Sequence, residues 1–265
     1  MVSARPCGHG ALLATGPFSA IFAGALACSS PSSPVEQDAE PADSGPDATP
    51  AENCFQLHLE EAIALNEKRK PLYSWLTQGR SDAISDKLIE SEKLSLVFAR
   101  AVDDAARPYQ QAGVAVACDE FVSMADVPVF RERYEFDPEP LAAFEPVDGV
   151  ALRDGLEATF AEEGFAGLAA AADTALDALE EPHAYHCMVR HMLESLRRIA
   201  NLAPTHEVNA QERGLSSPLS ISEDLVELHL LSIDPAAKLD EQASVLQSEG
   251  IPILCQDVPS IPPGP

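Results

Sequence analysis

Two stretches of the chain share a spacing of residue types that could bind a metal. Each has the pattern Cys-x3-His-x2-Glu, formed by Cys54, His58 and Glu61 and then by Cys187, His191 and Glu194. On a helix, the three side chains of each stretch lie on one face. A His and a Glu three residues apart also occur in di-iron carboxylate bundles, although there the Glu precedes the His. The pattern therefore has two interpretations, a transition-metal site or a structural polar contact beside a disulfide. We favour the structural contact.

The repeated pattern belongs to a longer duplication. Residues 84–124 align without a gap on residues 221–261, so each has an equivalent 137 positions later, whereas the offset is 133 in the block with the Cys-His-Glu pattern. A duplication of this length predicts two copies of one structural unit. We place copy one at 54–130, a connecting segment at 131–182 and copy two at 183–265.

Each copy is predicted to be a pair of antiparallel helices. In copy one, the first helix runs from Cys54 to about Lys70, where Pro71 interrupts it. The second covers about 84–112 and is followed by a short extended segment, 114–118.

Copy two is predicted to differ in its turns and breaks. A loop is expected from Pro204 to Leu219, and Asp234-Pro235 is expected to restart the second helix. In the connecting segment, residues 150–162 and 165–179 are Ala-rich and predict a helical pair separated by Gly164. The predicted fold class is all-α: two tandem copies of a disulfide-closed helical hairpin with an additional helical pair between them.

The cysteines of the two copies predict how each hairpin is closed. Each copy has one Cys where its first helix starts and one just past the end of its second. Antiparallel helices bring these two ends together. Four cysteines allow three pairings, and the equivalence of the copies favours Cys54–Cys118 with Cys187–Cys255. A Cys/His metal site is the alternative, and the absence of CxxC spacing argues against it.

The remaining residues give no sign of catalysis. The chain has no CxxCH, GxGxxG, P-loop, HExxH or GxSxG motif. The paired acids Asp103-Asp104 and Asp240-Glu241 are expected to lie on helices and to face solvent. A net charge of −26 repels phosphate backbones, so nucleic acid is excluded as a partner. We assign no catalytic residue and no cofactor, with a transition metal as the alternative.

The start of the chain is typical of an export signal. Residues 1–27 contain no acid, one basic residue (Arg5) and an apolar run that ends in small residues before Cys28. Residues 28–53 are rich in Ser, Pro, Ala and acids, and predict a disordered tether. The sequence Gly-Ala-Leu-Ala-Cys ending at Cys28 resembles the lipobox of bacterial lipoproteins, which implies lipidation of Cys28. Ordinary cleavage after Ala27 is the alternative, and it leaves an odd number of cysteines.

These observations predict an exported lipoprotein. We expect it to be lipid-anchored in the cell envelope, at the outer membrane or facing the periplasm, with Cys28 as the lipidated residue. Its helical part is expected to have a non-enzymatic binding or structural role toward an unknown protein or small molecule. The alternative is a metal-binding bundle enzyme or carrier that uses His58, Glu61, His191 and Glu194.

Overall fold

The computed structural model describes residues 53–125, 127, 144–179 and 185–264. The predicted signal segment, Cys28 and the tether up to residue 52 lie outside these residues. The described part is all-helical and has no strand, which confirms the predicted fold class. Its helices are α1 (Cys54–Thr77), α2 (Asp82–Gln111), α3 (Gly149–Ala178), α4 (Cys187–Glu212) and α5 (Leu219–Ser248). None of the described helices is long and apolar enough to cross a membrane.

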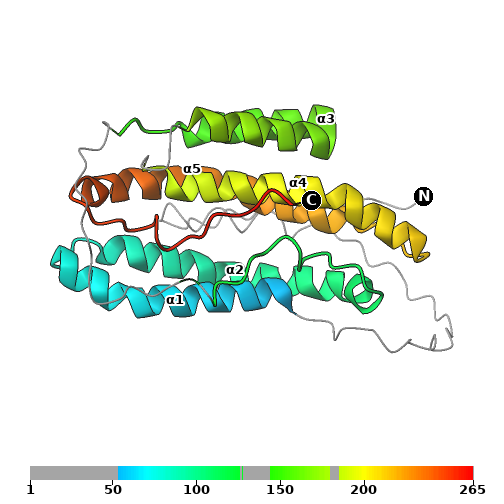
Figure 1. Ribbon diagram of the computed structural model, residues 1–265, viewed down its shortest axis with the longest axis horizontal. Coiled ribbons are helices and arrows are strands. Elements are labelled where there is room, and N and C mark those ends of the chain that lie inside the picture. The colour runs from blue at the N-terminus through cyan, green and yellow to red at the C-terminus, as the bar shows by residue number, and fades with distance from the viewer. Residues whose placement is uncertain (1–52, 126, 128–143, 180–184, 265) are drawn as a thin grey trace, which may run out of the picture. The chain divides into compact units, whose positions relative to one another are not determined.

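Copy one and copy two each form a helical hairpin closed by a disulfide. In copy one, α1 and α2 run in opposite directions (Figure 1), and the Cys54–Cys118 bond joins their open end. In copy two, the Cys187–Cys255 bond closes α4 and α5 in the same way. The Cα atoms of the bridged cysteines are 5.0 Å apart in both copies, so the predicted pairing within each copy is confirmed.

Several prolines lie inside continuous helices. Pro71 lies in α1, Pro204 in α4 and Pro235 in α5. The predicted interruption at Pro71 and the predicted restart at Pro235 were therefore wrong. The loop predicted from Pro204 to Leu219 begins later than expected, because α4 continues to Glu212. A proline costs an internal helix the hydrogen bond that its nitrogen would donate. Burial of apolar residues on both sides of each proline outweighs that cost, as with Ile233 and Ala237 around Pro235.

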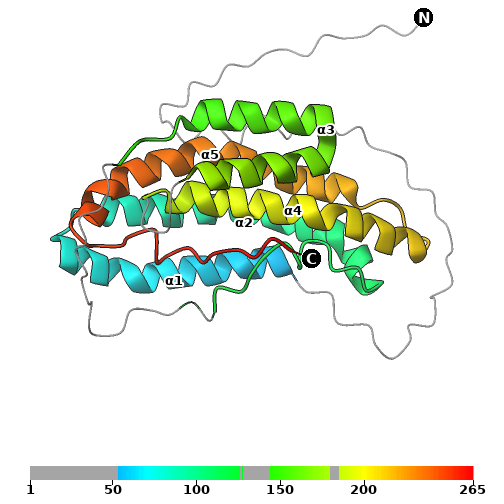
Figure 2. The same ribbon diagram turned by 45° about the horizontal axis from the view of Figure 1, so that its top comes forward.

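The described helices share one main hydrophobic core. Residues with almost no exposed surface come from every helix, including Phe55, Val102, Leu168, Leu193 and Ile233. α3 is the predicted helical pair, bent where Gly164 adopts a φ of 67°. It packs on α4 and α5, and Figure 2 shows α3 lying beside these two helices of copy two. Gly149 permits close packing, because a Cβ there would lie 2.7 Å from the Cα of Asp234.

The two copies contact each other through arginines that reach equivalent positions at the ends of α5 and α2. Arg80 of copy one forms an ion pair with Glu249 of copy two at 2.6 Å. In the opposite direction, Arg213 of copy two donates from Nε to the carbonyl of Ala112 of copy one at 2.8 Å, and Ala112 is the equivalent of Glu249. Contacts exchanged in this way are those of two units related by an approximate two-fold axis. The duplication therefore sets the packing of the copies as well as their internal structure.

Candidate functional site

The disulfide-closed end of each hairpin carries the repeated polar residues singled out from the sequence. Asp103 accepts hydrogen bonds from the backbone nitrogens of Phe55 (3.1 Å) and Gln56 (2.8 Å) at the start of α1. Asp240 does the same for Met188 and Val189 at the start of α4, both at 2.9 Å. The first N–H groups of a helix have no partner inside it, so each carboxylate satisfies two of them.

The expectation that Asp103 and Asp240 face solvent was wrong. Asp103 is 2% exposed and Asp240 is fully buried. Burial raises the pKa of Asp103, and it raises the pKa of Asp240 to about 7, although two backbone donors stabilise the charged form of each. Their neighbours Asp104 and Glu241 are exposed, as expected. These two acids are therefore caps for the helix of the same copy.

A glutamine beside each disulfide holds the segment that leads to the second cysteine. Gln110 donates to the carbonyl of Val116 at 3.0 Å, and its equivalent Gln247 donates to that of Ile253 at 2.8 Å. Between helix and cysteine the chain turns, with Ala117 at φ 64° and its equivalent Leu254 at φ 69°. The extended conformation predicted for 114–118 was wrong, because a left-handed residue is needed there to bring Cys118 back to α1.

His58 and His191 hold the segment that follows each disulfide. The Nδ1 of His58 lies 2.7 Å from the carbonyl oxygen of Val122, and that of His191 lies 3.0 Å from the carbonyl oxygen of Pro259. A carbonyl only accepts, so each Nδ1 carries the hydrogen. Burial lowers the pKa of both imidazoles, that of His191 to about 4, so both are neutral at pH 7.

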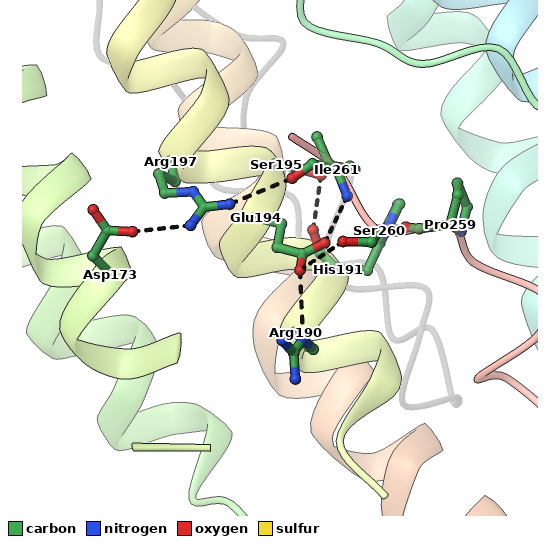
Figure 3. Close-up of polar contacts among 9 residues, drawn as sticks. All are labelled: Asp173, Arg190, His191, Glu194, Ser195, Arg197, Pro259, Ser260 and Ile261. Atoms are coloured by element: carbon green, nitrogen blue, oxygen red, sulfur yellow. Dashed lines mark hydrogen bonds and ion pairs between the residues drawn. The ribbon is translucent and has the colours of Figure 1, made fainter. Parts of the chain in front are cut away.

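Glu61 and Glu194 hold the same segments one helical turn further on. Glu61 accepts from the backbone nitrogen of Met124 at 2.8 Å. Its equivalent Glu194 accepts from that of Ile261 at 2.7 Å (Figure 3). Each carboxylate also accepts a serine hydroxyl, from Ser123 in copy one and from Ser260 in copy two. The repeated His-x-x-Glu pair thus acts on the chain's own backbone in both copies.

The candidate metal ligands do not gather with a further ligand in the described part of the chain. Among those residues, no group of three or more His, Cys, Asp or Glu side chains is placed to hold a metal ion. Cys54 and Cys187 are consumed by the disulfides. What the structure does bring together is one constellation per copy, formed by a disulfide, a capping Asp, a Gln, a His and a Glu.

A buried charged cluster between the copies was missed by reasoning from the sequence. Asp257 of copy two lies 3.0 Å from the guanidinium of Arg69 in copy one and accepts the Tyr73 hydroxyl at 2.9 Å. Its equivalent, Glu120 of copy one, lies 3.2 Å from the Nδ1 of His206, the equivalent of Tyr73. Burial alone would lower the pKa of His206, but Asp119 and Glu120 raise it to about 9.

The pairs formed by Asp257 and by Glu120 use equivalent positions of the two copies. The acid two residues beyond the second cysteine reaches the first helix of the other copy in both cases. Beside Asp257, Tyr73 and Ser85 line a small cavity with a volume of about 10 Å³, which is close to the space that one water molecule needs. The cluster therefore joins the two hairpins and leaves no room for a larger ligand in that cavity.

Comparison with known proteins adds no family to these observations. No family model, no curated protein and no solved structure matches the chain.

Proposed function

We propose that this chain is an exported lipoprotein of the cell envelope, attached through Cys28, whose helical module has a binding or structural role. The observation that carries the proposal is that the repeated polar residues bind the chain's own backbone. His58, Glu61 and their equivalents His191 and Glu194 each contact the chain's own backbone beside a disulfide. Residues engaged in this way position loops, and a binding module needs positioned loops more than it needs reactive side chains.

The two disulfides support export. Disulfides persist in oxidising compartments and are rare in the cytosol. All four cysteines of the two copies are bonded, so Cys28 is the cysteine of the exported part that remains for lipid.

The anchor is tested by fractionating cells that express the full chain or its Cys28→Ala variant. We expect the unmodified chain to partition into membranes, with an intact mass that starts at Cys28 and includes acyl groups. The variant should appear in the soluble extracytoplasmic fraction. A variant that still partitions wholly into membranes would overturn the anchor.

The non-enzymatic role is tested by metal analysis of the purified chain. We expect no stoichiometric iron, zinc or copper in the unmodified chain and none to lose in a His58→Gln, His191→Gln variant. Stoichiometric metal that disappears in this double variant would favour a metal-dependent enzyme or carrier instead.

A further inference from the structure

Copy two continues beyond its His-Glu pair with an additional set of contacts. Past Ile261, the chain stays on α4, where Arg198 donates to the carbonyl of Pro262 at 3.1 Å and Asn201 donates to that of Pro263 at 2.9 Å. Arg197 reaches the carbonyl of Ile261 at 3.4 Å, and Figure 3 shows this arginine between that carbonyl and Asp173 of α3. We call residues 259–264 the strap.

The strap is held as an extended peptide along one face of the helix. Its contacts come from residues 191, 194, 197, 198 and 201, spaced so that they lie on one side of α4. The ten steps from residue 191 to residue 201 of α4 rise about 15 Å at 1.5 Å each. The four steps from residue 259 to residue 263 cover about 12 Å at the roughly 3.1 Å per residue of a polyproline helix. The length of an extended segment is thus close to the length of α4 beside it, so successive carbonyls of the strap lie near successive donors of the helix.

The strap's contacts are directed at its backbone and at one apolar anchor. Pro259, Pro262 and Pro263 have no N–H to donate, so side chains that donate to carbonyls are suited to them. Ile261 is 4% exposed, whereas Pro262 and Pro263 are exposed. Proline-containing peptides are commonly recognised in this way, in a preformed extended conformation that loses little entropy on binding.

Copy one has the first half of this arrangement and lacks the second. Met124, 4% exposed, is the equivalent of Ile261, and Glu61 binds its backbone nitrogen. At the positions of Arg197 and Arg198, copy one has Ala64 and Leu65, which cannot donate from their side chains. Its chain turns after the anchor, with Val127 donating to the carbonyl of Met124. The two arginine donors therefore have no counterpart in copy one, and Lys68 stands at the position of Asn201.

We propose that this face of α4 is a recognition site for extended, proline-containing peptides with an aliphatic anchor, and that the strap occupies it in cis. The partner is a protein segment of that chemistry, which binds by displacing the strap. The inference gives the proposed binding role its partner class and rests on that role. Peptide binding is measured on the purified chain, so it can fail while membrane anchoring holds.

The test uses the full chain with Ile261→Asp, which places a charge at the buried anchor and releases the strap. The probe is a fluorescent peptide with the sequence of residues 258–264. We expect saturable binding to the variant and at least about tenfold weaker apparent binding to the unmodified chain, because a tethered segment competes at millimolar effective concentration.

Two further variants in the Ile261→Asp background identify the site. Adding Arg198→Ala and Asn201→Ala together should weaken peptide binding at least about tenfold. Adding Lys68→Ala, at the position in copy one equivalent to Asn201, should leave it unchanged. A folded Ile261→Asp chain that does not bind, or that binds equally after the Arg198 and Asn201 changes, would overturn the site.

A second measurement on the unmodified chain applies if Ile261→Asp fails to fold. Unlabelled peptide is added to isotope-labelled protein at a concentration several-fold above the millimolar effective concentration of the strap. The amide signals of Ser260, Ile261 and Gly264 should move toward the positions of an unstructured segment. Signals that stay in place would show that the strap is a permanent part of the fold and would overturn the proposal.

Discussion

Asp240 is a carboxyl group in a buried position that disfavours its ionised form. It caps α4 with two backbone hydrogen bonds, yet it is fully buried, and burial raises its pKa to about 7. In the unfolded chain the pKa of an aspartate is about 3.9, so between these two values only the folded chain holds the proton. The contribution of Asp240 to stability therefore falls as the pH rises from about 4 to 7.

Asp240→Asn should remove this pH dependence. The variant cannot titrate at position 240, so its free energy of unfolding should fall less between pH 4 and 7 than that of the unmodified chain. Urea unfolding at a series of pH values measures the difference. Glu241→Gln, at the exposed neighbour, is the control and should follow the unmodified chain. Identical pH profiles for Asp240→Asn and the unmodified chain would contradict the assignment.

The capping role of Asp103 and Asp240 was within reach of the sequence, but their burial was not. The Asp pair and the pair Gln110/Gln247 are both identities of the repeat, and polar identities retained in two copies indicate a shared structural task. Whether such residues are buried depends on how the start of the first helix docks beside the second. For Asp103 and Phe55 this contact spans 48 residues and leaves no local pattern.

At the scale of elements, spacing in the sequence was sufficient for some features and misleading for others. Cysteines at matched positions predicted both bridges correctly, because two antiparallel helices must bring these positions together. Prolines misled, because a local rule places a helix end at Pro204, whereas buried Leu202, Ala203 and His206 on either side favour continuation. Tertiary burial decides such cases, and a single sequence does not report it.

The two disulfides should be nearly equal in their effect on stability. They close loops of 64 and 68 residues, so the loop-entropy model gives each about 4 kcal/mol. Replacing Cys187 and Cys255 with Ala should lower the free energy of unfolding by about 2–5 kcal/mol, and replacing Cys54 and Cys118 should do the same. Urea unfolding followed by circular dichroism measures both pairs. Losses that differ by more than about 2 kcal/mol would contradict the equal contribution of the two bridges.

At the scale of the whole molecule, the buried pair between Arg69 and Asp257 joins residues 188 positions apart. Asp257→Asn removes the carboxylate from the buried guanidinium and should cost about 3–5 kcal/mol of unfolding free energy. Glu249→Gln is the matched control, because it breaks an exposed pair between the copies, with Arg80, and should cost at most about 1 kcal/mol. Equal losses in urea unfolding would contradict the role of burial.

The stability of the molecule should fall as the pH rises from 6.5 to 9. Burial raises the pKa of Asp240 to about 7 and that of Glu92 to about 8, so the folded chain holds protons that the unfolded chain has released. Nearby acids raise the pKa of His206 to about 9, so the stability from its charged form is lost toward that pH.

Below pH 6.5 an opposite effect limits the gain. Burial lowers the pKa of His191 and His229 to about 4, so the unfolded chain binds protons there first. We therefore expect the stability profile to be flatter below pH 6.5 than above it, measured by urea unfolding from pH 4 to 9. A profile that is flat or rising above pH 6.5 would contradict these shifts, and Glu92→Gln should make the decline less steep.

The exchange of contacts between the copies is the pattern of an isologous homodimer, here contained in one chain. In a dimer of identical subunits, every contact across the axis exists twice with the same two residues. A fused chain is free of that restriction. One side of its axis holds Arg69, Tyr73 and Asp257, while the other holds His206 and Glu120. Among the described residues, α3 packs on α4 and α5 and the strap lies on α4, both in copy two, so covalent fusion is what permits a symmetric scaffold to present a single asymmetric face.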